Sequence, residues 1–295
     1  MVTKIFISLI SLCIIALLSA CNGESTEKIV YEEDTISTEL ETVKKAKSVF
    51  YRMYLPSEMY KVFEKAGAVY DPAILNPVEN VNMYETSAKA ALNLGIYGVD
   101  LSYNKMFGQN QKTLLYFAVI HKLSQQMGIP DNQFANALKK MEKNITNRDS
   151  LTKYATEIFR STNRFLNEND REATSALVLT GGWVEAIYIS ASIADQNLNN
   201  TEIIERIAFQ KYSLRSLISL LSNYPEDPNV TKYLLLMKAL NRSFDKFEIY
   251  YELDDLSIDT INKLIGTNKV ELNLQSEHVA EIKTMIKQIR DDMVK

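Results

Sequence analysis

Two pairs of side chains in the middle of the chain have a spacing that acid–base chemistry could use. Asp100 and Tyr103 are three residues apart, and Glu185 and Tyr188 repeat that spacing. Residues three apart on a helix share a face, so each acid lies beside a tyrosine. If the two helices pack together, the carboxyl groups converge, and proximity and burial separate their pKa values into those of an acid and a base. The plainer interpretation is that each acid is buried in the core with a hydrogen-bond partner.

Aromatic and polar side chains near these acids outline a candidate ligand-binding site, because rings beside a few polar groups suit a sugar ring or a peptide. We expect no metal site and no cofactor, since the chain has only two His and two Cys. We assign no catalytic residue, because the common hydrolase and nucleotide-binding motifs do not occur. The candidate ligand-binding residues are Tyr97, Asp100, Tyr103, Gly181, Gly182, Trp183, Glu185 and Tyr188.

The elements that must position these residues are helices. Beyond the N-terminal region, apolar residues recur at three- and four-residue spacing, which is typical of amphipathic helices. Pro- and Gly-containing segments at 128–131 and 223–228 mark breaks between them. No run of alternating residues with a hairpin turn is evident. The sequence predicts an all-α fold, a multi-helix bundle or array of about nine or ten helices.

Four glycines interrupt the two helices that carry the acids, namely Gly95, Gly98, Gly181 and Gly182. Glycine inside a helix costs about 1 kcal/mol relative to alanine, so something should compensate. The glycines either allow two helices to approach closely or expose backbone to a ligand cleft. We favour close approach.

The same two segments align with each other. Residues 91–103 match residues 176–188 without gaps at five identical positions, and Asp100 then faces Glu185. One hypothesis is an internal duplication with halves at about 78–165 and 166–255 in a pseudo-two-fold arrangement. The alternative is a chance match between two apolar helices.

The N-terminus has the pattern of a secretory signal. Lys4 precedes an apolar stretch at 5–18, and small residues precede Cys21. The apolar stretch is shorter than the ~20 residues that a membrane-spanning helix needs. The tetrapeptide 18–21, Leu-Ser-Ala-Cys, resembles the lipobox of bacterial lipoproteins. That resemblance implies removal of residues 1–20 as a signal peptide and lipid attachment at Cys21.

The resemblance also divides the rest of the chain. Residues 21–41 become a lipidated acidic tether, and 42–295 a single all-α domain. Asn22 stands where an Asp would favour retention at the inner membrane, so we expect an outer-membrane destination. Which side of that membrane the protein faces stays open. A net charge of −4 does not favour nucleic acid as a partner.

A second resemblance rests on two segments, LNLGIYGVDLSYNKMFGQNQ and SALVLTGGWVEAIYIS. They are similar to uncharacterised all-helical lipoproteins of Bacteroidota-type bacteria, which implies an envelope location and a helical fold but no activity. The sequence therefore predicts a lipid-anchored cell-envelope protein that acts as a non-catalytic binding or scaffold module. Its partners would be the membrane, through the lipid, and a glycan, a peptide or another envelope protein. The alternative is an envelope hydrolase or lyase that uses Asp100 and Glu185.

Overall fold

A computed structural model of the chain describes residues 56–131, 160–196, 200–251, 256–259, 264–267, 270–273 and 276–295. Residues 45–295 group as one compact unit, to which all of these belong. The predicted signal peptide, Cys21 and the tether lie outside the described residues, so they stay predictions.

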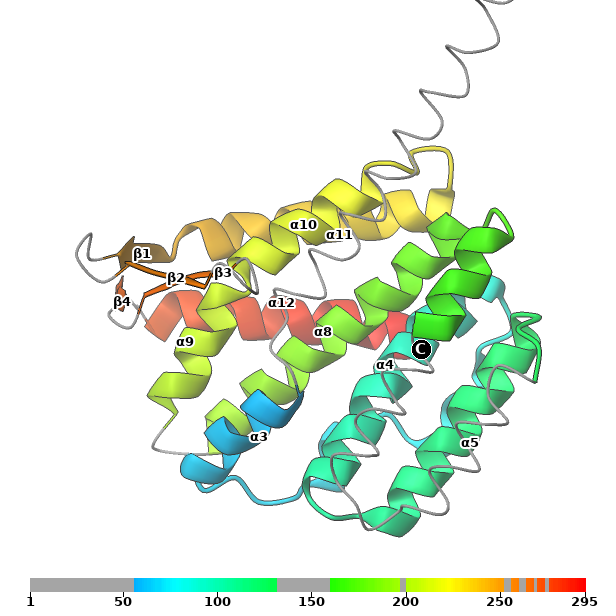
Figure 1. Ribbon diagram of the computed structural model, residues 1–295, viewed down its shortest axis with the longest axis horizontal. Helices are drawn as coiled ribbons and strands as arrows, with labels where there is room; N and C mark the ends of the chain where they lie inside the picture. The colour runs from blue at the N-terminus through cyan, green and yellow to red at the C-terminus, as the bar shows by residue number, and fades with distance from the viewer. Residues whose placement is uncertain are drawn as a thin grey trace, which may run out of the picture. The chain divides into compact units, whose positions relative to one another are not determined.

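The body of the protein is helical, which confirms the predicted fold class (Figure 1). The described residues contain nine α-helical stretches, in line with the predicted number. Two short 3₁₀ helices, η1 (Pro72–Ile74) and η2 (Val78–Met83), lie between the first two α-helices. The α-helices are α3 (Pro56–Lys65), α4 (Ser87–Met106), α5 (Asn110–Gln126), residues 160–168, α8 (Glu172–Gln196), α9 (Thr201–Phe209), α10 (Lys211–Leu221), α11 (Pro228–Asp245) and α12 (Ser276–Val294).

Four short strands between α11 and α12 are an addition that the sequence pattern did not predict. Strand β1 (Glu248–Tyr251) pairs antiparallel with β4 (Val270–Asn273), and β2 (Leu256–Asp259) pairs antiparallel with β3 (Leu264–Thr267). Each strand has only four residues, which is at the lower limit at which alternation can be recognised. In chain order, β2 and β3 both lie between β1 and β4.

Local sequence signals fix where several helices begin and end. The hydroxyl of Thr86 accepts a hydrogen bond from the backbone N–H of Lys89 and so caps α4, and Asp227 caps α11 in the same way. Helix α4 is followed by Gly108 at a φ of 70° and α5 by Gly128 at 72°. That left-handed conformation favours glycine, and it lets the chain turn sharply at the end of each helix.

The pair formed by α4 and α8 is the centre of the core, and the two helices lie side by side (Figure 1). Among the described residues, α8 is the one helix long and apolar enough to cross a membrane, but 83% of its apolar window is buried inside the protein. Burial on several sides is expected of the central helix of a bundle. Its apolar surface is thus used for packing within the protein.

Helix α12 packs on both α4 and α8 and ends against the beginning of α4. The last turn of a helix leaves carbonyl groups without partners inside the helix. Here Nζ of Lys89 donates to the carbonyl of Asp292 at 2.5 Å, and Nδ2 of Asn93 donates to that of Met293 at 3.0 Å. The hydroxyl of Tyr84 donates to the carbonyl of Val294 at 3.3 Å. These bonds fix the position of α12 and of the side chains it contributes to the core.

Candidate functional site

The glycines of the two central helices mark a close crossing. A Cβ atom on Gly95 would lie 2.0 Å from the carbonyl oxygen of Val178, and one on Gly181 would lie 1.9 Å from that of Leu92. Both distances are far inside van der Waals contact, so the predicted close helix approach is confirmed at these two positions. A Cβ on Gly182 would make ordinary contact at 3.5 Å.

The contacts at this crossing are reciprocal. Leu92 meets Gly181 and Gly95 meets Val178, and Arg171 at the start of α8 donates to Ser87 at the start of α4 at 3.2 Å, so the two helices run in the same direction past each other. This direction brings Asp100 level with Glu185, the two residues that the sequence alignment pairs. The internal duplication stays a hypothesis.

The structure brings the two predicted acids together. Asp100 on α4 and Glu185 on α8 have no solvent-exposed surface, and their carboxyl groups lie close enough for each to shift the pKa of the other. Arg290 of α12 closes the pair: its Nε donates to one oxygen of Glu185 at 2.7 Å and its Nη2 to the other at 2.9 Å. The same Nη2 also reaches the backbone carbonyl of Ile74 at 3.2 Å. The result is a buried triad of two carboxyl groups and one guanidinium.

The electrostatics of the triad divide the charge unequally. Burial raises the pKa of Asp100 well above its ordinary value, and the neighbouring Glu185 raises it further. Burial also raises the pKa of Glu185, but Arg290 opposes this by stabilising the charged form. We therefore place the single negative charge on Glu185, where it balances Arg290, and a proton on Asp100, which can then donate to Glu185.

A segment before α4 seals the triad from one side. The backbone N–H of Asn76 donates to Oδ2 of Asp100 at 3.1 Å, and its carbonyl accepts from the hydroxyl of Tyr116 at 3.0 Å. Its side-chain amide donates to Tyr84 at 2.9 Å and to Asn93 at 3.1 Å. Asn76 is itself fully buried. Protein groups thus occupy the space through which a substrate would have to reach the acids.

Two of the predicted tyrosines hold this segment in place and do not join the acids. The hydroxyl of Tyr97 donates to the carbonyl of Pro77 at 2.8 Å. The hydroxyl of Tyr103 accepts from the backbone N–H of Asp71 at 3.0 Å, and its ring stacks on Tyr70 with centroids 5.6 Å apart. Burial raises the pKa of both Tyr97 and Tyr103, so their hydroxyls stay neutral. Their role in the structure is packing and positioning.

Tyr188 is the candidate that does lie beside the triad. The guanidinium of Arg290 lies over its ring, 4.3 Å from the centroid. Such a cation–π contact is electrostatically favourable and helps to hold the arginine in a dry environment. The ring therefore covers the cation on the face of α8 that also carries Glu185.

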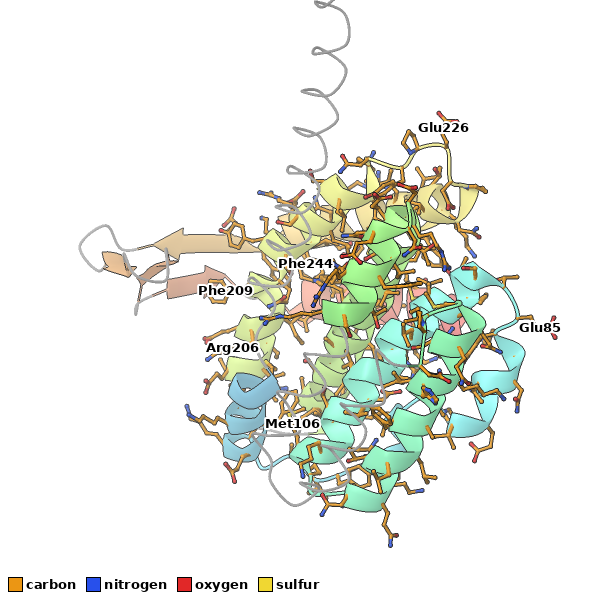
Figure 2. All side chains as sticks on the ribbon, turned by 45° about the vertical axis from the view of Figure 1, so that its right-hand side comes forward. Glu85, Met106, Arg206, Phe209, Glu226 and Phe244 are labelled. Carbon is orange, nitrogen blue, oxygen red and sulfur yellow. The ribbon has the colours of Figure 1, made fainter. Side chains whose placement is uncertain are left out.

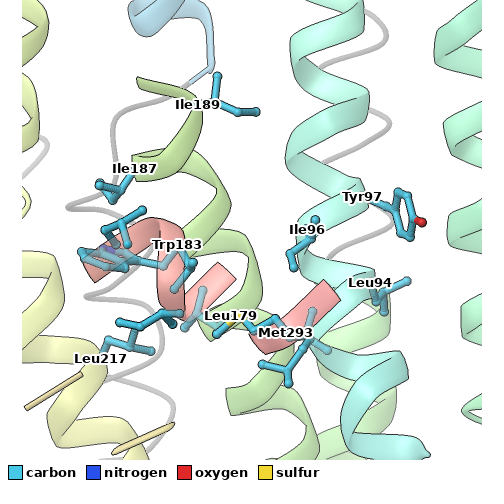
Figure 3. Close-up of a cluster of buried hydrophobic side chains, with 14 of the residues drawn as sticks. Leu94, Ile96, Tyr97, Leu179, Trp183, Ile187, Ile189, Leu217 and Met293 are labelled. Carbon is cyan, nitrogen blue, oxygen red and sulfur yellow. The ribbon is translucent and has the colours of Figure 1, made fainter. Parts of the chain in front are cut away.

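Trp183 lies on a different stripe of α8 and lines a pocket of its own. In Figure 3, Trp183 and Ile187 project from the side of α8 that faces away from α4. The indole Nε1 donates to the hydroxyl of Ser213 at 2.8 Å. The pocket has about 350 Å³ of empty space, including its open mouth, and its lining residues are Met59, Trp183, Ala186, Ile187, Ser190, Arg206, Ile207 and Gln210.

The sequence reasoning missed two central groups, Arg290 and Asn76. Arg290 had a visible signal: it follows Ile282 and Ile286 at four-residue intervals, so a charged residue continues an apolar stripe of the last helix. A charge at such a position calls for a buried partner. Asn76 lies in a Pro-flanked segment with no pattern of its own, and only the tertiary structure shows that it is buried.

No three or more His, Cys, Asp or Glu side chains gather into a group that could hold a metal ion in the described part of the chain. No family model matches the chain, and searches of curated proteins and of solved structures find no match either.

Proposed function

We propose that the chain is a lipid-anchored cell-envelope protein that acts as a non-catalytic binding or scaffold module. The observation that carries the non-catalytic part is the closure of the triad: Asp100 and Glu185 have no exposed surface, and Arg290 occupies both oxygens of Glu185. We therefore assign these two acids a role in the stability of the fold. The lipid anchor is supported by the sequence around Cys21 alone.

The alternative, a hydrolase or lyase that uses the two acids, is disfavoured by the same geometry. Carboxyl pairs in glycosidases lie roughly 5 to 9.5 Å apart across an open cleft, with room for substrate or water. Asp100 and Glu185 lie beside each other without exposed surface and are closed off by protein. A binding role is left to the surface, where the Trp183 pocket is a concave and partly polar candidate.

The anchor is tested by two matched substitutions in the full chain, Cys21→Ser and Cys13→Ser. Acylation requires the thiol at position 21, so Cys21→Ser should move the protein from the membrane fraction to the soluble fraction. Cys13 lies inside the predicted signal, so Cys13→Ser should leave the membrane association unchanged. Fractionation of both variants from their native envelope gives the result, and a membrane-bound Cys21→Ser protein would contradict the anchor.

The binding role is tested on the mature chain carrying Cys21→Ser, which needs no detergent. We expect at least one envelope glycan or peptide to raise its melting temperature, since a ligand that binds only the folded state stabilises it by mass action. Hydrolysis of any of these compounds during incubation would favour the enzyme alternative.

A further inference from the structure

Helix α11 carries a stripe of solvent-exposed side chains along one face. The opposite, buried side of the helix packs on α10, α12 and α8. Beyond the first turn of α11, the exposed positions recur at three- and four-residue spacing, so they lie on the same face. The members of this α11 stripe are Lys232, Leu235, Lys238, Arg242 and Asp245.

Leu235 is the apolar member of the stripe and is 63% exposed. A single exposed leucine is ordinary on a protein surface. Here Lys232 precedes it by three residues and Lys238 follows it by three, so cations flank it on both sides along the face. Apolar and basic residues combined on one face are typical of helices that lie at a membrane surface.

Two cations of the stripe have no acid to neutralise them. Lys238 and Arg242 form no ion pair with any residue that the structure describes. Between Asp227, which caps its first turn, and Asp245 in its last turn, α11 contains no acidic residue. Asp245 is itself paired with Arg215 of α10 at 2.7 Å.

Acids on neighbouring elements do not cancel this charge. Those of α12 that reach α11 each have a lysine partner, in the ion pairs Lys232–Asp292 and Lys246–Glu281. Glu248 follows the helix and has an interaction of its own. Glu226 lies in the turn before α11, at the edge of the body (Figure 2). Lys238 is about 15 Å beyond the start of the helix at Pro228, which exceeds the screening length of about 8 Å at physiological salt.

We propose that this face of α11 docks on an anionic bilayer surface, with Leu235 in the headgroup region and Lys238 and Arg242 against lipid phosphates. The inference rests on the proposed lipid anchor, which would hold the body close to a membrane. A face with so few cations binds a bilayer weakly by itself, but a tether raises its effective concentration there. Since the chain has a net charge of −4, the same surface repels its acidic remainder, so the contact orients the body.

The test attaches the mature chain, residues 21–295, to vesicles through a maleimide lipid on Cys21, its one thiol. Leu235→Trp places an indole in the stripe, and brominated lipids quench an indole that enters the bilayer. Trp183, the one natural tryptophan, has no exposed surface, so its emission is a constant background. We expect quenching on brominated phosphatidylcholine mixed with phosphatidylglycerol, and none on brominated phosphatidylcholine alone or at high salt.

A second position shows whether the quenching is specific to α11. Leu115 of α5 is 50% exposed and is the matched leucine on another helix. Leu115→Trp on the same vesicles should show no quenching, because the proposed contact turns α11 and not α5 toward the lipid.

Two pairs of charge substitutions, each added to Leu235→Trp, test the role of the cations. Lys238→Gln with Arg242→Gln should lower the ratio of docked to undocked protein about 25-fold, since each cation near an anionic surface contributes about fivefold. Lys61→Gln with Lys112→Gln removes two exposed lysines from α3 and α5, and should leave that ratio unchanged.

The proposal is overturned if the indole at position 235 is not quenched on anionic vesicles, if neutral vesicles quench it equally, or if the indole at position 115 is quenched as strongly. Because the attachment to the vesicle is chemical, such a result bears on the docking face alone. The lipid anchor fails on a different observation, a Cys21→Ser protein that stays in the membrane fraction.

Discussion

Asp100 and Glu185 are both buried carboxyl groups, yet their surroundings favour the protonated form of Asp100 and the charged form of Glu185. Glu185 receives two hydrogen bonds from a guanidinium, whereas Asp100 receives one backbone N–H and faces another carboxyl group. A buried charge without a cation beside it is costly, so the proton stays on Asp100. The two residues that looked equivalent in the sequence therefore have opposite electrostatic roles.

The pH dependence of stability follows from the raised pKa of Asp100. As pH rises through its ordinary value of 3.8, Asp100 ionises in the unfolded chain but stays protonated in the folded protein, so the free energy of unfolding falls. The fall continues until the raised pKa of the folded state is reached. The pKa of Glu185 is also raised, so this residue also lowers the free energy of unfolding as the pH rises.

Asp100→Asn imitates the protonated acid and should remove the contribution of this residue to the pH dependence of stability. Its amide oxygen can accept from the backbone N–H of Asn76, as Oδ2 of Asp100 does, and its uncharged NH₂ group would face Glu185. We expect the variant to be more stable than the unsubstituted protein at pH 7, with the difference shrinking as the pH falls below 4. Urea unfolding at a series of pH values measures this, and an equal pH dependence in both proteins would show that Asp100 is ionised in the fold.

At the scale of elements, the crossing of α4 and α8 explains two of the four helical glycines. Gly95 and Gly181 admit the backbone of the opposite helix, whereas a Cβ on Gly182 would make only an ordinary contact, so the crossing does not require glycine there. At Gly98 an added Cβ would meet nothing within 4 Å, so the crossing does not require glycine there. Nothing in the structure explains this residue.

The two kinds of glycine should respond to alanine in opposite directions. Gly181→Ala places a methyl group on the carbonyl of Leu92, and we expect it to destabilise the protein by about 1–3 kcal/mol or more. Gly98→Ala, in the same helix pair, should stabilise it by about 1 kcal/mol through helix propensity. Chemical denaturation compares the two, and a tolerated Gly181→Ala would mean that the helices do not approach this closely.

Much of the element-level organisation was readable from the sequence, because helical periodicity is a local signal. It predicted the helical fold, the turns and the two central helices. The sealing of the acids was not predictable in this way. It depends on Arg290, which lies 105 residues after Glu185, and on Asn76, whose segment has no periodicity. The strands at 248–273 were missed because each is only four residues long.

At the scale of the molecule, the triad joins parts that are far apart in the chain. Asp100 belongs to α4, Glu185 to α8 and Arg290 to α12, and the segment around Asn76 closes over them. Since α12 also has its last carbonyl groups bonded by side chains from α4 and from the segment before it, the C-terminal helix completes the core. We infer that the triad supports the stability of the whole body.

The measurement that tests this account most directly is the urea unfolding of Glu185→Gln and of Glu185→Gln combined with Arg290→Met. If the triad is structural, Glu185→Gln leaves a buried guanidinium without its carboxylate and lowers the free energy of unfolding by about 3–5 kcal/mol. Removing that cation as well should recover part of the loss, so the double variant should be more stable than the single one. A Glu185→Gln protein that keeps its full stability while losing ligand binding or hydrolysis would contradict the account.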